Sequence, residues 1–404
     1  MKILHLSNIA GKLGGGVSQV VHSLLYHQTS NGAEARLWFL GHKRLEKEIS
    51  SDEGLDIDRL SAIKLRSFLF PSIFIRFNSL LNEVNIVHQH GIFLPTSLLS
   101  LMASRSNKVI ISPHGYLEPE KLRVSILKKK IVLFLFEKLN LMNCSCLIAC
   151  SRQEASYLRD FGLKQPIALL PNGVDESFVR NDSNNNKNTS FRTKYEISLD
   201  TKVLLFLSRI HPFKGLKLFL ESLVIIKEQF RKNKWIFIIA GQDELNHEKE
   251  LRQIVTKHKM EDIVRFVGPQ YGKEKIEALD SADCFILPSK GENFGISIIE
   301  ALARGVPVLT TKNTPWKELN ETQCGWWIER SIEGFSNTLL QIISTSSSDL
   351  CQMGNKGIVL IKDRFTWPNI TIQSMQIYKW VLNDFREEYN NGFSLYEEEK
   401  KEEA

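Results

Sequence analysis

Apolar runs of five to seven residues alternate with amphipathic stretches along most of the chain. The runs are too short for helices of ordinary length and are flanked by polar residues, glycine or proline, so the pattern predicts buried strands. Runs without polar alternation are typical of parallel strands covered on both faces. The predicted strands are ILHLS (3–7), ARLWFL (35–40), NIVHQH (85–90), KVIIS (108–112), CLIACS (146–151), PIALLP (166–171), KVLLFLS (202–208), WIFIIA (235–240), IVRFVG (263–268), DCFILPS (283–289) and VPVLTT (306–311).

Helical patterns such as 215–231 and 244–258 lie between these runs. Regular alternation of strands and helices predicts an α/β fold with doubly wound parallel sheets. A chain of 404 residues exceeds what one hydrophobic core usually organises, so we expect two domains. The polar stretch NDSNNNKNTS at 181–190 has nothing to bury and is the expected linker between them.

The expected domains are residues 1–176 and residues 190–365, each about the size of one doubly wound domain. A last helical pattern follows at 366–386. The remaining residues, 387–404, are rich in charge, and we expect them to be disordered.

The composition is that of a globular protein, with 43% hydrophobic and 24% charged residues. The net charge is +6, and it is uneven: residues 1–175 carry +7 and the remainder carries −1. A basic first half suits an anionic membrane surface or an anionic acceptor. We do not expect nucleic acid as a partner, because the sequence lacks the interleaved aromatic and basic patch of a binding module.

Glycines between positions 11 and 16 stand where the apolar core of a secretory signal should continue. The apolar runs also fall far short of the roughly 18 residues of a membrane span. Cys144, Cys146 and Cys150 lie along one strand-like run without the second ligand group of a zinc site, so ordinary reduced thiols are expected. These features together favour a cytoplasmic protein without a metal centre.

The strongest chemical signal is PSKGENFGISIIEALARGVPVLT, from Pro288 to Thr310. It begins at the carboxyl end of a predicted strand, which is where ligands bind in open α/β sheets. The helix that begins near Gly295 offers free backbone N–H groups to an anion such as a diphosphate. A carboxylate accepts hydrogen bonds from a diol without a competing donor, so Glu292 is a candidate for a sugar and Glu300 for a ribose.

A second loop, SRIHPFKG at 208–215, also lies between a predicted strand and a helix. Its cations, Arg209 and Lys214, would face the ligand from one loop. Fixed cations suit a diphosphate, because its charge grows as the sugar–phosphate bond breaks. A solvated charged loop is the alternative interpretation.

The first domain contributes a glycine loop and several histidines. The loop GKLGGGV at 11–17 lets backbone N–H groups approach a phosphate or a sugar, although a tight turn explains it equally well. It lacks the G-x-G-x-x-G spacing of dinucleotide enzymes, which disfavours an oxidoreductase. The histidines at predicted strand ends are His88, His90 and His114, whereas His5 and His22 have no comparable context.

These motifs resemble those of the retaining glycosyltransferases of family 4, which have the GT-B fold. The whole string PS-x-x-E-x-FG-x-x-x-x-EA-x-A-x-G-x-PV is specific, whereas an isolated pair of glutamates at this spacing is not. SRIHPFKG resembles the R-x4-KG phosphate clamp of the same family. The resemblance spans roughly residues 1–385 and is densest at 205–325. It implies two Rossmann-like domains around a cleft, with the C-terminal helix returning to the first domain.

The resemblance also assigns roles to individual residues. Catalytic roles fall on Glu292, His114, Arg209 and Lys214, with His114 similar to a residue that contacts the transferred sugar. Donor binding falls on Gly15, Gly16, Arg209, Lys214, Val267, Glu292, Asn293, Phe294, Gly295, Ile296 and Glu300. The acceptor or cleft side falls on Gly14, His90 and Asn172, although His90, like His88, is more simply structural and turn chemistry alone accounts for Asn172.

Two segments depart from the family pattern. Gly241-Gln-Asp-Glu replaces the more usual G-x-G, which leaves both UDP and GDP open as the donor nucleotide. The segment from Thr314 to Leu319 stands where many relatives carry glycines before a glutamate. Glu318 would match that glutamate, and Trp316 is expected to reshape the sugar pocket.

The activity implied by the resemblance is metal-independent transfer with retention of the anomeric configuration, without a cofactor beyond the UDP- or GDP-type donor. The acceptor would be a saccharide or a lipid-linked saccharide, in the synthesis of a bacterial lipopolysaccharide, capsule or exopolysaccharide. Two alternatives are a sugar-nucleotide epimerase of the same fold and a nucleotide-sugar binding protein without turnover. A protein without turnover should have lost Glu292, Arg209 or Lys214, and this sequence retains all three.

Two first-domain segments are basic and rich in large apolar residues: KLRSFLFPSIFIRF at 64–77 and KLRVSILKKKIVLFLFEK at 121–138. Cationic segments of this kind lie in a lipid interface. This reading would place the protein at the inner face of the plasma membrane, with a lipid-linked acceptor. The alternative is a core-packed helix with a basic, solvated face.

Overall fold

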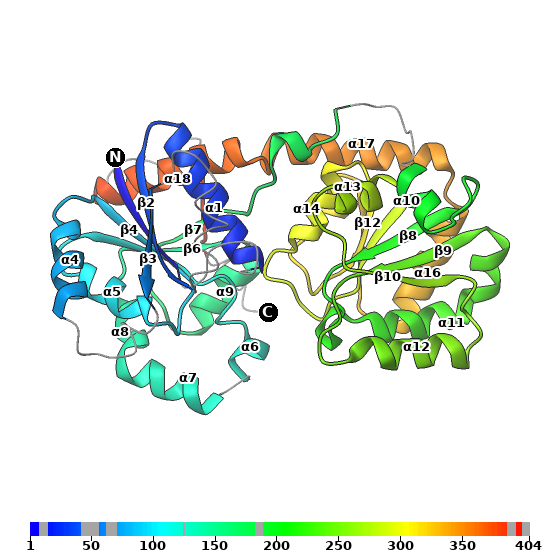
Figure 1. Cartoon of the computed structure of the whole chain (residues 1–404), viewed down its shortest axis with the longest axis horizontal. Helices are drawn as coiled ribbons and strands as arrows, with labels where there is room; N and C mark the ends of the chain where they lie inside the picture. The colour runs from blue at the N-terminus through cyan, green and yellow to red at the C-terminus, as the bar shows by residue number, and fades with distance from the viewer. Residues whose placement is uncertain are drawn as a thin grey trace, which may run out of the picture. The chain divides into compact units, whose positions relative to one another are not determined.

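The chain forms two compact units, each built on a parallel sheet flanked by helices (Figure 1). The first unit is Met1–Gly173 with Trp367–Ala404, and the second is Val174–Thr366. The predicted α/β class with two parallel-sheet domains is thereby confirmed. The residues that this computed structural model describes are 1–7, 15–41, 56–61, 71–123, 126–181, 189–385 and 393–397. Most of the expected linker at 181–190 lies outside these ranges.

The sheet of the first unit has the order β14-β7-β6-β5-β4-β1-β2-β3. Its pairs are parallel except for that of β14 with β7. The prediction from apolar runs did not include β3, because DIDRLS carries three charges in six residues. The strands are β1 Lys2–Ser7, β2 Glu34–Gly41, β3 Asp56–Ser61, β4 Ile86–His90, β5 Lys108–Ser112, β6 Cys146–Ala149, β7 Ile167–Leu169 and β14 Ser394–Leu395.

The expectation of a disordered tail at 387–404 is wrong for part of that segment. Ser394 pairs with Leu169, and Leu395 pairs with Ala168, in antiparallel register. The free edge of β7 offers unpaired backbone groups, and a two-residue strand satisfies some of them despite the charge around it. The rest of the tail lies outside the described residues.

Helices cover the first sheet, and the last of them, α18, comes from the far end of the chain. It packs on α1 in the same unit (Figure 1), as expected for the segment 366–386. The helices are α1 Gly15–Ser30, α4 Pro71–Leu81, α5 Thr96–Ala103, α6 Pro119–Arg123, α7 Ile126–Val132, α8 Lys138–Asn143, α9 Arg152–Asp160 and α18 Trp367–Leu382, with a π-helical turn at Leu133–Glu137.

The sheet of the second unit has the order β10-β9-β8-β11-β12-β13 and is entirely parallel. Its strands are β8 Lys202–Leu207, β9 Trp235–Ala240, β10 Val264–Gly268, β11 Cys284–Leu287, β12 Val308–Thr311 and β13 Gly325–Ile328. Its helices are α10 Thr189–Lys194, α11 Leu216–Lys232, α12 His247–Lys257, α13 Gly272–Asp280, α14 Ile296–Ala303, α15 Glu318–Glu321, α16 Ile332–Ser344 and α17 Ser347–Arg364, with 3-10 turns at Glu176–Phe178 and Pro212–Lys214.

The strand order reverses direction between β8 and β11, because the chain runs outward from β8 through β9 to β10 and returns to the other side of β8 at β11. Loops that leave two such neighbouring strands diverge to opposite faces and open a crevice for ligands. The two strongest motifs follow β8 and β11. In the described part of the chain, the helices are all too short or too polar to cross a bilayer.

Glycines allow α14 and α17 to pack closely. A Cβ atom on Gly354 of α17 would lie 1.9 Å from the carbonyl oxygen of Gly305, which ends α14. Backbone cannot move aside as a flexible side chain can, so we expect Gly354→Ala to destabilise the second unit by about 2 kcal/mol. The shift of its urea unfolding midpoint measures this cost.

Gly357→Ala is the matched control in the same helix. Its Cβ would meet the end of the Leu302 side chain at 2.9 Å, which can rotate, and alanine favours the helix by about 1 kcal/mol. We therefore expect little or no loss. Equal losses in the two variants would contradict a backbone clash at Gly354.

Candidate functional site

The two motif loops of the second unit are held against each other by backbone contacts. Gly215 has a φ of 77°, and a Cβ atom there would lie 1.9 Å from the carbonyl oxygen of Pro288. The backbone N–H of Lys290 donates to the carbonyl of Phe213 at 2.9 Å. Only glycine permits this approach, so the last residue of the KG pair fixes one loop on the other.

Lys214 and Glu292 meet at this junction. Lys214 Nζ lies 2.6 Å from Glu292 Oε1, and Ser289 Oγ donates to the same oxygen at 2.5 Å. The two charged side chains are 12% and 13% exposed. The structure thus brings together a cation and a carboxylate that are 78 positions apart in the sequence.

Arg209 follows the same strand as Lys214 but has a different partner. Its Nη1 atom donates to both carboxylate oxygens of Glu244, at 3.1 and 2.9 Å. The Arg209 side chain is 63% exposed. A phosphate group at this loop would have to compete with Glu244 for the guanidinium.

The loop after β11 turns into α14 at Gly295, whose φ is 89°. The indole Nε1 of Trp316 donates to the carbonyl of Phe294 at 2.5 Å, and the two rings pack with centroids 5.3 Å apart. Asn293 and Ile296 flank this turn, where the first N–H groups of the helix are available to an anion. Trp316 is buried, and its contacts with Phe294 stabilise the turn.

Glu300 is buried in α14 and pairs with a lysine that the sequence analysis did not consider. Lys275 Nζ in α13 lies 2.5 Å from Glu300 Oε1. Burial raises the pKa of Glu300, and Lys275 opposes this shift. A ribose at Glu300 would share this carboxylate with the lysine.

Val267, the expected contact for the base, lies at a register shift between β10 and β9. Its carbonyl oxygen accepts from Gln270 Nε2 at 3.1 Å and from Tyr195 Oη at 3.3 Å. The carbonyl is therefore already engaged within the second unit.

In the first unit, His90, His114 and Asn172 line one small cavity. The residues around them are Val20, Leu24, His88, Ser112, Ile148, Cys150, Glu154, Leu170, Pro171, Trp367 and Ile370. The cavity measures about 20 Å³, enough for one water molecule.

Gly15 and Gly16 begin α1 instead of forming a loop, and Gly14 lies outside the described residues.

His114 stands on a turn that a buried carboxylate holds in place. Both His114 and Gly115 have positive φ, 53° and 76°. Glu154 accepts from the backbone N–H of Gly115 at 2.6 Å and from that of Cys150 at 2.8 Å. Burial lowers the pKa of His114 to about 4, so the ring is neutral at neutral pH.

Sequence reasoning missed His5, which lies beside His88 in the register of β1 and β4. One ring nitrogen each from His5, His88 and His90 lies within 4.8 Å of the others. Hydrogen bonds already use these nitrogens: His5 contacts His90 and Gln28, and His88 contacts Tyr378 and Ser112. The register of two adjacent parallel strands was the signal that could have grouped these rings.

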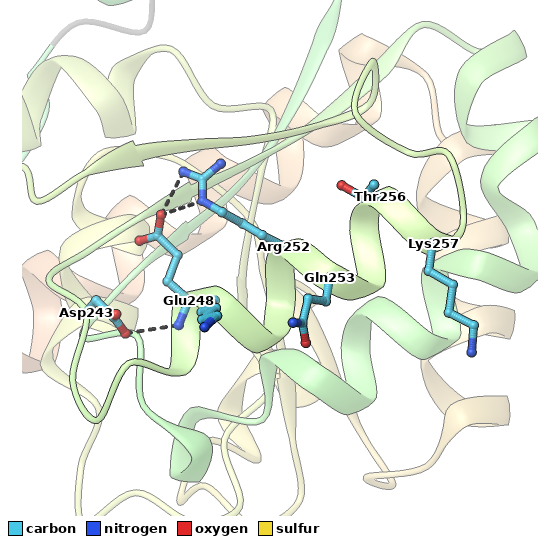
Figure 2. Close-up of a pocket in the computed structure, with 7 residues that line it drawn as sticks. Asp243, Glu248, Arg252, Gln253, Thr256 and Lys257 are labelled. Carbon is cyan, nitrogen blue, oxygen red and sulfur yellow. Dashed lines mark hydrogen bonds and ion pairs between the residues drawn. The ribbon is translucent and has the colours of Figure 1, made fainter.

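An open hollow on the surface of the second unit runs along α12 (Figure 2). Asp243 accepts from the backbone N–H of Glu248, and Glu248 pairs with Arg252. Arg252 also lies 4.3 Å above the ring of Phe266. None of the predicted site residues is among the described residues that line this hollow.

Two protein-family models together match most of the chain. Glycosyltransferase Family 4 matches residues 14–178, and Glycosyl transferases group 1 matches residues 187–358. The O-antigen biosynthesis glycosyltransferase WclY of Escherichia coli is 25% identical over 219 residues, 54% of this chain and 56% of WclY. The chain thus spans about half the length of that relative.

A second relative aligns over a longer stretch. The GDP-mannose:cellobiosyl-diphosphopolyprenol alpha-mannosyltransferase of Xanthomonas oryzae pv. oryzae is 23% identical over 322 residues, 77% of this chain and 78% of that protein. Among solved structures, HepE from Anabaena, in complex with UDP and glucose, matches with a TM-score of 0.74 at 17% identity. The match covers 94% of this chain and 99% of HepE, and it shows a common fold.

The Lys275–Glu300 pair yields a prediction about pH. Lys275→Met leaves a buried carboxylate unpaired, so we expect a loss of about 3 kcal/mol of unfolding free energy at pH 7. A raised folded-state pKa means that stability falls as the pH rises above 4.5, the ordinary value for glutamate. The loss should therefore shrink as the pH falls toward 4.5, because Glu300 of the folded state then takes up a proton and loses its charge. Urea unfolding between pH 4.5 and 8 measures it.

Glu300→Gln in the Lys275→Met background is the control. The neutral amide removes the charge that the lysine would have balanced, so the extra pH dependence should disappear. A loss in Lys275→Met that stays constant across the pH range would argue against a buried ionised Glu300.

Proposed function

The chain belongs to the families Glycosyltransferase Family 4 and Glycosyl transferases group 1, and we propose that it transfers a sugar from a nucleotide diphosphate sugar to a saccharide acceptor. Its two parallel-sheet units form the GT-B fold. The observation that carries the proposal is the junction of Lys214, Ser289 and Glu292 beside the first turn of α14, at the point where the strand order reverses.

Lys214, Arg209 and the N–H groups at the start of α14 would bind the diphosphate. Negative charge grows on the leaving phosphate as the bond from the anomeric carbon to oxygen breaks, so cations fixed in advance stabilise the transition state more than the ground state. Glu292 would accept hydrogen bonds from the sugar hydroxyls and Glu300 from the ribose.

We propose that transfer retains the anomeric configuration. The acceptor oxygen would attack on the face that the diphosphate leaves, and the departing phosphate oxygen would take the acceptor proton. The new bond then replaces the old one on the same face, without a covalent enzyme intermediate. The cations of the SRIHPFKG loop supply positive charge to the leaving group, which supports a metal-independent reaction.

The relatives support both types of donor. HepE is described in complex with UDP and glucose, and the Xanthomonas relative is a GDP-mannose enzyme. We propose a UDP- or GDP-sugar as the donor. The name of that relative includes a diphosphopolyprenol acceptor, and WclY acts in O-antigen biosynthesis, so a lipid-linked saccharide of a bacterial surface polysaccharide is the proposed acceptor.

The alternatives receive less support. A binding protein without turnover has no need to keep Arg209, Lys214 and Glu292 together, and this chain keeps all three. WclY and the Xanthomonas relative are both named as transferases and not as epimerases.

The helical stretch 131–142, which overlaps the segment 121–138, presents apolar side chains outward, and this supports lipid contact. Its inward side includes a buried polar cluster: Glu137 accepts from the backbone N–H of Phe93 at 2.7 Å, and Asn140 donates to Glu137 and Gln89. Leu141 is buried in the core on the same side. The outward face of the stretch, here called the α7–α8 face, repeats every three or four residues and is 52–87% exposed. It comprises Ile131, Phe134, Leu135, Leu139 and Met142.

Lys130 and Lys138 lie exposed in the same stretch, which suits an anionic lipid surface. We propose that the α7–α8 face holds the protein at such a surface, close to a lipid-linked acceptor. The other basic segment, 64–77, supports this less. Its described part includes Phe77, which is buried against Trp38, and residues 64–70 lie outside the described ranges.

The donor site can be tested by thermal shift with UDP, GDP and their sugars in the presence of EDTA. A nucleotide that binds only the folded state stabilises it according to its concentration over its Kd. We expect one diphosphate to stabilise the protein selectively, and Lys214→Ala to abolish the shift and to lower kcat about 10²–10³-fold. NMR of the product reports its anomeric configuration.

Lys217→Ala is the control, because Lys217 is 54% exposed and pairs with Glu250 outside the junction. It should leave both binding and turnover unchanged. Full activity of Lys214→Ala would falsify the phosphate clamp, and a need for divalent metal would rule out metal independence.

Lipid binding can be tested by flotation with vesicles of phosphatidylglycerol and phosphatidylethanolamine. Replacing Phe134 and Leu135 by Ser removes two apolar anchors, so we expect vesicle affinity to fall at least about tenfold. Leu245→Ser, at a 76% exposed leucine of the second unit, is the control. Equal flotation of all three proteins would leave the α7–α8 face without a lipid role.

A further inference from the structure

Three histidine rings form a hydrogen-bonded row inside the first unit. His5 Nδ1 lies 2.9 Å from His90 Nε2, and His90 Nδ1 lies 3.1 Å from His114 Nε2. The far end of the row is His5 Nε2, which lies 2.8 Å from Gln28 Oε1. The row therefore leads from a buried amide on α1 to His114 at the small cavity.

The direction of the hydrogen bonds is set by α18. Ser374 Oγ lies 2.8 Å from the carbonyl oxygen of Thr371, which can only accept, so the Ser374 hydroxyl proton points there. The Ser374 oxygen then accepts from Gln28 Nε2 at 3.1 Å. With its amide nitrogen committed to Ser374, Gln28 presents its oxygen to His5, and His5 Nε2 must carry a proton.

This polarity passes along the row because each neutral imidazole has one N–H and one lone pair. His5 Nδ1 is therefore unprotonated and accepts from His90 Nε2–H. His90 Nδ1 is then also unprotonated and accepts from His114 Nε2–H. Burial lowers the pKa of His5 and of His114 to about 4 and that of His90 well below its usual value, so all three rings are neutral at pH 7.

We propose that Gln28, acting through His5 and His90, holds His114 in the Nε2–H tautomer, so that His114 Nδ1 serves as a hydrogen-bond acceptor for a sugar hydroxyl. His114 meets His90 through Nε2, and His114 Nδ1 has no hydrogen-bond partner in the part of the chain that the structure describes. Gln28, His5 and His90 are thus positioning residues. The identity of the hydroxyl rests on the proposed function, whereas the tautomer does not.

The same rings could be considered as a metal site, but the hydrogen bonds argue against it. A bound ion needs three converging lone pairs, and the row uses the Nδ1 lone pair of His5 for His90 and that of His90 for His114. Both nitrogens of His88 face hydroxyl groups, those of Tyr378 and Ser112. His88 would have to lose one of these hydrogen bonds to bind a metal ion. It is also not part of the row of His5, His90 and His114.

The tautomer can be observed directly in the full chain. Long-range ¹H–¹⁵N NMR of protein labelled with ¹⁵N-histidine separates protonated from unprotonated ring nitrogens, and His114→Gln assigns the His114 signals. At pH 7 we expect protonated Nε2 and unprotonated Nδ1 at His114. Protonated Nδ1 at His114 would overturn the proposal.

Two substitutions of one residue test the control by Gln28. Gln28→Leu removes the acceptor for His5 Nε2–H, so the row should lose its single direction and His114 should show both tautomers. Gln28→Glu, in its neutral protonated form, keeps both an oxygen that accepts from His5 and a donor to Ser374, so it should keep the wild-type His114 signals. An unchanged His114 tautomer in Gln28→Leu would show that the row does not set it. Thermal melting confirms that each variant is folded.

Activity gives an independent readout. In Gln28→Leu, kcat/KM should fall about five- to tenfold, the size of one neutral hydrogen bond, and Gln28→Glu should recover most of it. The NMR measurement needs no donor or acceptor. If transfer cannot be detected but the tautomer is as expected, the proposed function fails and the histidine row stands. If transfer occurs but the tautomer is reversed, the row fails alone.

Discussion

The close approach of Gly215 to the Pro288 carbonyl is the contact on which the donor side of the molecule depends. Parallel strands present their carboxyl ends at one edge, and β8 and β11 are neighbours there. The loops that leave them could still diverge. A glycine with positive φ and the hydrogen bond from Lys290 to Phe213 bring them together, which sets Lys214 beside Glu292.

The fold was largely predictable because buried parallel strands are nearly continuous apolar runs. The run at 235–240 matches β9, and 108–112 matches β5, at both ends. The prediction missed β3, β13 and β14, which all lie at an edge of their sheet. β3 carries three charges and β14 spans two residues, whereas β13 is a short apolar run of four residues, GWWI. A hydropathy pattern detects long buried runs, so it loses short or polar edge strands first.

The candidate site was predictable only where its residues belong to a local motif. Glu292 and Lys214 stand in such motifs, and the structure brings them together. Their roles in binding remain predictions. Lys275, Glu244 and Gln28 were not predicted. Their partners, Glu300, Arg209 and His5, lie 25, 35 and 23 positions away in the sequence. Pairing at such distances follows from the fold and leaves no spacing rule in the sequence.

The first unit is discontinuous in sequence, and this affects the order in which the protein can form during synthesis. Its sheet comes from the first 173 residues, but α18 supplies Ser374 and Tyr378 to its interior. The second unit, residues 174–366, is continuous. It leaves the ribosome complete while the first unit still lacks a helix. The amino-terminal half of the chain is thus the last to finish folding, the reverse of the usual order in multidomain proteins.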